Sequence, residues 1–204
     1  MLVRLVIILL KKSNKYIYNI INMNKILKIK NNNSLSHPST WIKNNLSKGN
    51  NNLNLLDLAC GSGRHSIYAG SLGYKVTSVD INKDKLYKLN KYNFIEAVQL
   101  DIECNDFWPF KEKTFDVIIV SNYLYRPILQ NIVKSIKKEG KLLYETFTSE
   151  NSTLGKPNNK DYLLKSQELL NLAKHNCLDV INYEEIILEN PIKKAVQRLY
   201  ARVK

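Results

Sequence analysis

The sequence is poor in the residues that cross-link chains or bind metals. It has three cysteines and three histidines in 204 residues. Cys60, Cys104 and Cys177 show no C-x-x-C spacing, and no histidine lies near them in ligand register. We therefore expect neither a disulfide framework nor a metal site, and a reducing, cytoplasmic setting is the default expectation.

Also absent is any apolar run long enough to cross a bilayer, which needs about 20 residues. Residues 5–10 are apolar, but Lys11 and Lys12 follow at once, and no small-residue cleavage site comes after them. The sequence therefore predicts no membrane span and argues against a secretory signal. A basic organelle-targeting presequence stays open.

Acidic residues are missing from the first 56 positions, which hold nine basic residues. From Asp57 onward the basic and acidic residues nearly balance, at 22 and 18, although the whole chain carries a net charge of +13. We predict a basic, disordered extension over residues 1–33 and a single domain over residues 34–204. Such an arm binds nucleic acid or an anionic membrane, or is a solvated tail. A start at Met23, with residues 1–22 as an upstream artefact, is a further interpretation.

The chain is organised around one strand–turn–helix–strand unit over residues 53–80. Residues 53–58 form a short apolar run typical of a strand that is buried on both faces. Residues 59–63, ACGSG, form a small flexible turn, residues 64–72 fit a helix, and a second strand ends at Asp80. Parallel sheets bind ligands at the carboxyl ends of their strands, so Asp57, the turn and Asp80 surround one crevice suited to a nucleoside.

The turn lacks the third glycine of the dinucleotide-binding fingerprint, because Ser66 stands at that position. It also opens with Asp57, whose carboxylate would repel a pyrophosphate but suits a cofactor that carries an amine and a sulfonium. The pattern D-x-A-x-G-x-G resembles the first motif of the class I methyltransferases that use S-adenosylmethionine. It departs from that motif by Ala59, which is tolerable if this residue has a negative φ. An NAD-type oxidoreductase is the disfavoured alternative.

The likeness is greatest to small, stand-alone bacterial methyltransferases of the tellurite-resistance type. Residues 115–129 (FDVIIVSNYLYRPIL), 142–147 (LLYETF) and 195–204 (AVQRLYARVK) carry it beyond the first motif. The resemblance implies an α/β fold with a Rossmann-like, seven-stranded, mostly parallel sheet, helices on both faces and an antiparallel terminal strand. Strands are predicted at residues 53–58, 74–79, 94–100, 115–120, 141–147, 180–188 and 195–203. Helices are predicted from Ser36 or Ser39 to about residue 47, at 64–72, 83–92 and 166–176, and from Pro127 to a stop at residues 137–140.

The resemblance also implies the residues that bind S-adenosylmethionine. Asp80 accepts hydrogen bonds from the ribose hydroxyls, and Asp101 follows the third strand, where an acid commonly contacts the adenine amine; a loop-capping carboxylate is the alternative for Asp101. The expected cofactor-binding residues are Asp57, Ala59, Cys60, Gly61, Gly63, Asp80, Ile81, Asp101, Ile102, Ser121 and Asn122. For Cys60 we expect packing rather than catalysis.

The methyl acceptor should lie near the loops after the fourth and fifth strands. Tyr123 either borders the methyl group or packs, Arg126 either holds an anionic acceptor or is exposed at a helix start, and Glu145 is either a base or a buried, paired carboxylate. His65 is a weaker candidate base, with helix-start packing as its alternative. Trp41 belongs either to a lid over the cofactor or to the docking of its helix.

The function predicted is methyl transfer to an unidentified acceptor, of small-molecule type, with tellurite or selenite suggested by the better-known branch of the family. RNA- or protein-directed methylation is an alternative. A third hypothesis is a non-catalytic module that binds S-adenosylmethionine or uses the basic arm to bind nucleic acid. The acceptor and the oligomeric state stay open at this level.

Overall fold

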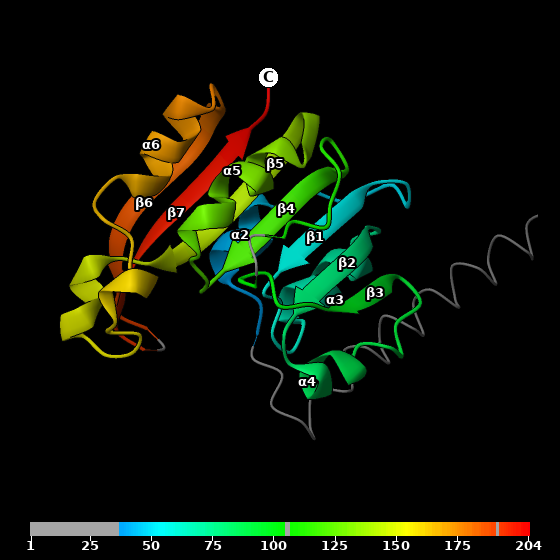
Figure 1. Cartoon of the computed structure of the whole chain (residues 1–204), viewed down its shortest axis with the longest axis horizontal. Coiled ribbons are helices and arrows are strands. Elements are labelled where there is room, and N and C mark those ends of the chain that lie inside the picture. Colours follow the sequence, from blue (N-terminus) through cyan, green and yellow to red (C-terminus); the bar gives the residue numbers. More distant parts are fainter. Residues whose placement is uncertain (1–36, 105–106, 191) are drawn as a thin grey trace, which may run out of the picture. The chain divides into compact units, whose positions relative to one another are not determined.

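The computed structural model describes residues 37–104, 107–190 and 192–204. The predictions on the basic extension, including the start at Met23, lie outside the described residues. The described chain forms one compact unit, His37–Lys204. Its seven-stranded sheet has the order β3-β2-β1-β4-β5-β7-β6 (Figure 1). The strands are β1 (Asn54–Leu58), β2 (Lys75–Asp80), β3 (Ile95–Gln99), β4 (Phe115–Ser121), β5 (Ile136–Phe147), β6 (Asp179–Leu188) and β7 (Lys194–Arg202).

Strands β1 to β5 are parallel, and β7 runs antiparallel to both β5 and β6. The predicted mostly parallel sheet with an antiparallel terminal strand is therefore confirmed. The order reverses at β1, whose neighbours are β2 and β4. In an open parallel sheet such a reversal separates the loops at the carboxyl ends of the strands and leaves a crevice there.

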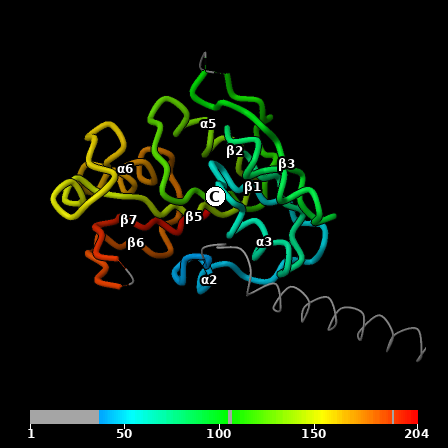
Figure 2. The backbone as a smooth tube through the Cα atoms, turned by 90° about the horizontal axis from the view of Figure 1, so that it is seen from below, coloured from blue at the N-terminus to red at the C-terminus, as the bar shows by residue number. Residues whose placement is uncertain are grey.

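Helices cover both faces of the sheet, as predicted (Figure 2). Buried side chains of α5 (Leu129–Lys134) and α6 (Glu168–His175) share one core cluster with Ile118 and Val120 of β4. Those of α2 (Thr40–Asn45), α3 (Arg64–Ser71) and α4 (Lys83–Tyr87) share the other cluster with Val117 and Ile119. Successive strand residues point to opposite faces, so the unbroken apolar run of β4 is explained by burial on both sides.

The helix predicted from Pro127 to residues 137–140 is shorter than expected. It begins as a 3₁₀ turn, η2 (Arg126–Ile128), continues as α5 and ends at Lys134. The Ser135 hydroxyl donates to the Asn131 carbonyl at 2.9 Å, and Ile136 already pairs with Phe115 of β4. Strand pairing therefore overrides the helical spacing that Ile136 suggested. The helix predicted at 83–92 likewise ends at Tyr87.

Helix α2 begins where the sequence predicted a cap, since the Ser39 hydroxyl accepts a hydrogen bond from the Ile42 amide. Trp41 is 6% exposed, the Arg198 guanidinium lies over its ring, and its indole N–H donates to Asn182 at 3.4 Å. These contacts dock α2 on β6 and β7. No helix within the described ranges is long and apolar enough to span a membrane. Two further short 3₁₀ turns lie in the described part of the chain, η3 (Ser149–Thr153) and η4 (Lys160–Tyr162).

Candidate functional site

The glycine turn between β1 and α3 is held by the last residue of β2. One carboxylate oxygen of Asp80 accepts from the Gly61 amide at 2.7 Å, and the other accepts from the Asn82 amide at 2.9 Å. The Cys60 amide donates to the Val79 carbonyl at 2.8 Å, which continues the pairing of β1 with β2 into the turn. Asp80 therefore fixes the turn while each of its oxygens keeps a further lone pair for a ligand.

Asp57 lies beneath the turn and not at its surface. Its side chain is 1% exposed and accepts from the Ser66 hydroxyl at 2.5 Å. Ser66, which stands where a dinucleotide-binding turn has glycine, thus supplies the partner of this carboxylate. Burial raises the pKa of Asp57 to about 6, against hydrogen bonds from Ser66 and the charge of Arg64, which lower it.

The raised pKa of Asp57 predicts a pH-dependent stability. The folded state binds this proton more tightly than the unfolded state, whose pKa is 3.8, so the carboxylate's contribution falls as pH rises from about 4 to about 6. His65 has the opposite effect on stability, because burial lowers its pKa to about 3. The unfolded state binds this proton more tightly, so the contribution of His65 to stability rises with pH. We expect Asp57→Asn to become more stable relative to the parent as pH rises through that window, by an amount on the order of 2–3 kcal/mol. Urea unfolding of both proteins at pH 4 and pH 7 measures it; a pH-independent difference would contradict the assignment.

Three residues of the turn have left-handed backbone: Ala59 (φ 52°), Gly61 (φ 58°) and Gly63 (φ 74°). The negative φ that would make alanine readily tolerable at position 59 is not observed, so this alanine carries a conformational cost of about 1–2 kcal/mol. The two glycines differ in their surroundings. A Cβ on Gly61 would meet nothing within 4 Å, whereas a Cβ on Gly63 would lie 2.5 Å from the buried Leu89 side chain.

This difference predicts unequal effects of alanine at the two glycines. Gly61→Ala should lose about 1–2 kcal/mol of unfolding free energy through its positive φ alone. Gly63→Ala should lose about 2–4 kcal/mol, because the crowding of Leu89 adds to the same backbone cost. Urea unfolding of both variants provides the measurement. Equal losses would show that Leu89 moves aside freely.

A first cavity of about 440 Å³ opens at the carboxyl ends of β1, β2 and β3. It contains five of the predicted cofactor-binding residues, including Ile81, which is 62% exposed, and Ile102, which is 6% exposed. The Asp101 carboxylate accepts from the Glu103 amide at 3.0 Å, so this residue also caps its own loop. The lining residues are Ala59, Asp80, Ile81, Leu100, Asp101, Ile102, Glu103, Cys104 and Tyr123.

The other predicted cofactor-binding residues do not line this first cavity. Cys60 is 7% exposed, and burial together with the Asp57 charge raises the pKa of its thiol, which favours packing over thiolate chemistry. Ser121 accepts from the Arg64 guanidinium at 3.0 Å. Asn122 has a φ of 56°, which turns the chain sharply after β4.

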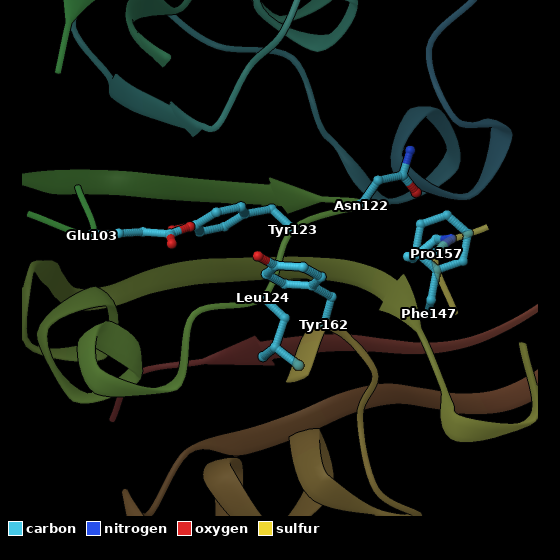
Figure 3. Close-up of a pocket in the computed structure, with 7 residues that line it drawn as sticks. All are labelled: Glu103, Asn122, Tyr123, Leu124, Phe147, Pro157 and Tyr162. Atoms are coloured by element: carbon cyan, nitrogen blue, oxygen red, sulfur yellow. The ribbon is translucent and has the colours of Figure 1, made fainter. Parts of the chain in front are cut away.

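A second cavity of about 370 Å³ adjoins the first and shares Glu103 and Tyr123 with it (Figure 3). Its lining residues are Glu103, Asn122, Tyr123, Leu124, Phe147, Pro157 and Tyr162. The Tyr123 hydroxyl is buried and makes no hydrogen bond of standard geometry with any residue that the structure describes. The Glu103 carboxylate points toward it, and burial together with that charge raises the pKa of the phenol.

Arg126 is engaged by the protein itself. Its guanidinium makes a two-point ion pair with Glu168, at 2.8 and 3.0 Å. It also donates to the Asp161 and Leu163 carbonyls, at 2.9 and 2.8 Å. These contacts tie the segment before α6 to η2, so the geometry supports a structural role rather than the capture of an anionic acceptor.

Glu145 is a buried, paired carboxylate. It is 1% exposed and accepts from Arg198 at 2.7 Å and from the Ser39 hydroxyl at 3.1 Å. His65 is 2% exposed, and its Nε2 accepts from the Ser39 amide at 3.1 Å, with burial holding the imidazole neutral. Both side chains hold the start of α2 in place. Neither of them lines the two cavities described above.

Several of the residues that line the two cavities were not predicted from the sequence. Glu103 follows the predicted Asp101 and Ile102, and its position just after a parallel strand is a signal that could have included it. Phe147 ends the predicted fifth strand and carries a similar signal, whereas Pro157 and Tyr162 give none, because the loop after β5 shows no periodicity that would place it over the end of the sheet.

Comparisons with known proteins find methyltransferases. Residues 56–144 match the family described as "Methyltransferase domain". An 88-residue segment, 41% of the chain, is 33% identical to "Probable S-adenosyl-L-methionine-dependent methyltransferase TehB" of Haemophilus influenzae. The match spans 31% of that relative's length, so the chain spans about a third of the curated relative.

Solved structures share the fold. The TehB structure from Haemophilus influenzae aligns with a TM-score of 0.66 and 24% identity, covering 86% of this chain and 65% of TehB. Geranyl diphosphate C-methyltransferase from Streptomyces coelicolor, solved with S-adenosyl-L-homocysteine, aligns with a TM-score of 0.62 and 11% identity, over 80% of this chain and 76% of that one. Residues 56–144 therefore match a methyltransferase domain, and the described residues share the fold of the TehB structure.

Proposed function

We propose that this protein transfers a methyl group from S-adenosylmethionine to a small-molecule acceptor. The observation that carries the proposal is the first cavity, where Asp80 both holds the glycine turn and borders the open space. The family match and the S-adenosyl-L-homocysteine bound in the Streptomyces neighbour support the choice of cofactor.

The residues present fit an adenosine with a cationic tail. Asp80 keeps free lone pairs for ribose hydroxyls, and Asp101 offers a carboxylate oxygen to an exocyclic amine. Ile81 and Ile102 provide apolar contact for an adenine ring. The space over Gly61 leaves its backbone accessible to a ligand. Asp57, buried under the turn, adds negative charge next to the position expected for the amine and the sulfonium. The same charge would repel a pyrophosphate.

Bound S-adenosylmethionine supplies an electrophilic methyl group. The chain's own contribution is to hold the acceptor in line with that methyl group and to exclude water, and alignment of this kind is worth about 7–11 kcal/mol in well-oriented reactions. Tyr123 lies between the two cavities and is therefore the predicted catalytic-site residue that best fits such a role. Arg126 and Glu145 fit it less well, because the protein occupies both side chains.

The size of the second cavity favours a small acceptor over a macromolecule. Its seven lining residues enclose about 370 Å³, which suits a metabolite or a single inserted side chain or base. RNA- or protein-directed methylation, and nucleic-acid binding through residues 1–33, rest on the basic N-terminal sequence alone.

The test combines binding and turnover. Isothermal titration with S-adenosylhomocysteine should show micromolar binding, and methyl transfer should be followed by S-adenosylhomocysteine release across tellurite, selenite, thiols, amines and RNA. Binding of NADH in place of S-adenosylhomocysteine would overturn the proposal. Binding without turnover on any acceptor would favour the non-catalytic module.

A further inference from the structure

The second cavity has a chemical character that the cofactor assignment does not explain. Among its lining residues one side chain is charged, the carboxylate of Glu103, and three are aromatic: Tyr123, Phe147 and Tyr162. Figure 3 shows Glu103 and Phe147 at opposite ends of the labelled group, with the two tyrosine rings between them. The buried Tyr123 hydroxyl faces the Glu103 carboxylate, so the phenol and the carboxylate together form the polar end of the cavity.

The neighbouring cations do not reverse this character. The Lys194 ammonium lies 5.7 Å from the centroid of the Phe147 ring, but Lys194 does not line the cavity, and it interacts with Glu145. The Arg126 guanidinium already donates hydrogen bonds to Glu168 and to two backbone carbonyls. An oxyanion entering the second cavity would meet the Glu103 carboxylate without a free cation on the lining.

Aromatic faces and a carboxylate together recognise a positively charged amine. A cation over an aromatic face gains about 0.5–2 kcal/mol, more where water is excluded, and a carboxylate adds a charge-assisted hydrogen bond. We propose that the second cavity binds a small amine as the methyl acceptor, with Glu103 as the residue that selects its charge. The proposal rests on the proposed function, since it assigns the acceptor class of that same site.

Methyl transfer to an amine balances at this site. The bound ammonium first loses a proton to the Glu103 carboxylate, which is exposed and passes it to water. The nitrogen lone pair then forms a bond to the methyl carbon as the carbon–sulfur bond breaks and its electron pair goes to sulfur. The products are an N-methylammonium and neutral S-adenosylhomocysteine, and no oxidant or reductant is needed.

The experiment compares three probes of similar shape and different charge on the full-length protein with S-adenosylhomocysteine present. Benzylamine, benzyl alcohol and benzoate are titrated calorimetrically, with sodium tellurite as an oxyanion. We expect benzylamine to bind at least about tenfold more tightly than benzoate, a difference of about 1.4 kcal/mol. Glu103→Gln should abolish that preference, whereas Glu112→Gln, an exposed glutamate that lines neither cavity, should keep it.

The outcomes separate this inference from the proposed function. Equal or tighter binding of benzoate or tellurite, no benzylamine binding at millimolar concentration, or a benzylamine preference that survives Glu103→Gln would each overturn the amine assignment. In all three cases intact S-adenosylhomocysteine binding leaves the proposed function standing. Loss of S-adenosylhomocysteine binding in the parent protein would instead overturn the proposed function.

Discussion

Replacing Asp80 by alanine is expected to weaken S-adenosylhomocysteine binding by about 100-fold or more. The carboxylate anchors the Gly61 and Asn82 amides and borders the first cavity. The variant therefore loses the predicted bonds to the ribose hydroxyls and frees the turn at the same time. Hydrogen bonds to a charged group contribute about 1.5–3 kcal/mol each, so the loss of two accounts for an effect of this size.

Asp84→Ala provides the matched control for this measurement. Asp84 lies four residues further along, is exposed in the first turn of α4 and carries the same charge. Its affinity for S-adenosylhomocysteine should stay within about twofold of the parent, because exposed charges separated by solvent are largely screened. An Asp80→Ala affinity close to that of the control would remove Asp80 from the cofactor site. Circular dichroism of both variants verifies that the fold is retained.

Replacing Arg198 by methionine is expected to destabilise the fold by about 3–5 kcal/mol, because it leaves a buried carboxylate without its cation. Glu145 is 1% exposed and, among the residues that the structure describes, would keep only the Ser39 hydroxyl as a side-chain donor. Arg198 also pairs with Glu184 at 3.1 Å and covers the Trp41 ring, so α2 should loosen as well. Urea unfolding at pH 7 measures the loss.

Arg202→Met, on the same strand, is the control. Its ion pair with Asp179 is 3.0 Å long, but the two side chains are 44% and 35% exposed, so its removal should cost much less stability than the removal of Arg198. If the Arg198 variant fails to fold, the double variant Glu145→Leu with Arg198→Met should restore folding, since it removes the unpaired charge. Similar small losses at both arginines would show that Glu145 is not dependent on its partner.

The sheet was predictable because each of its strands can be recognised from the residues of one short segment. The apolar runs of β1 and β4, the turn residues at 59–63 and the hairpin of β6 and β7 each follow from short-range patterns. Where a short-range pattern competed with strand pairing, prediction failed. Ile136 has the spacing of a helix residue, yet it pairs with Phe115 of β4.

The side-chain partners in the site were less predictable. The pairing of Asp57 with Ser66 spans one turn and one helix start, and that of Glu145 with Arg198 joins residues 53 positions apart. No periodic pattern in the sequence indicates either of these side-chain pairs. Arg126 illustrates the same limit, because its charge suggested a ligand until the loop carbonyls of Asp161 and Leu163 came to lie beside it.

By itself the sequence determined the strand–turn–helix unit over residues 53–80 and the order of the elements, and it predicted the type of cofactor. These depend on backbone freedom, apolar spacing and charge within short segments, which local residue choice controls. Only the tertiary structure decided which polar groups are already satisfied and which face open space. It buries Asp57, pairs Glu145 and Arg126, and leaves Glu103 and the Tyr123 hydroxyl at the boundary of two cavities. That outcome depends on long-range packing of loops and strand ends, where the free energy of a side chain is set by neighbours far away in the chain.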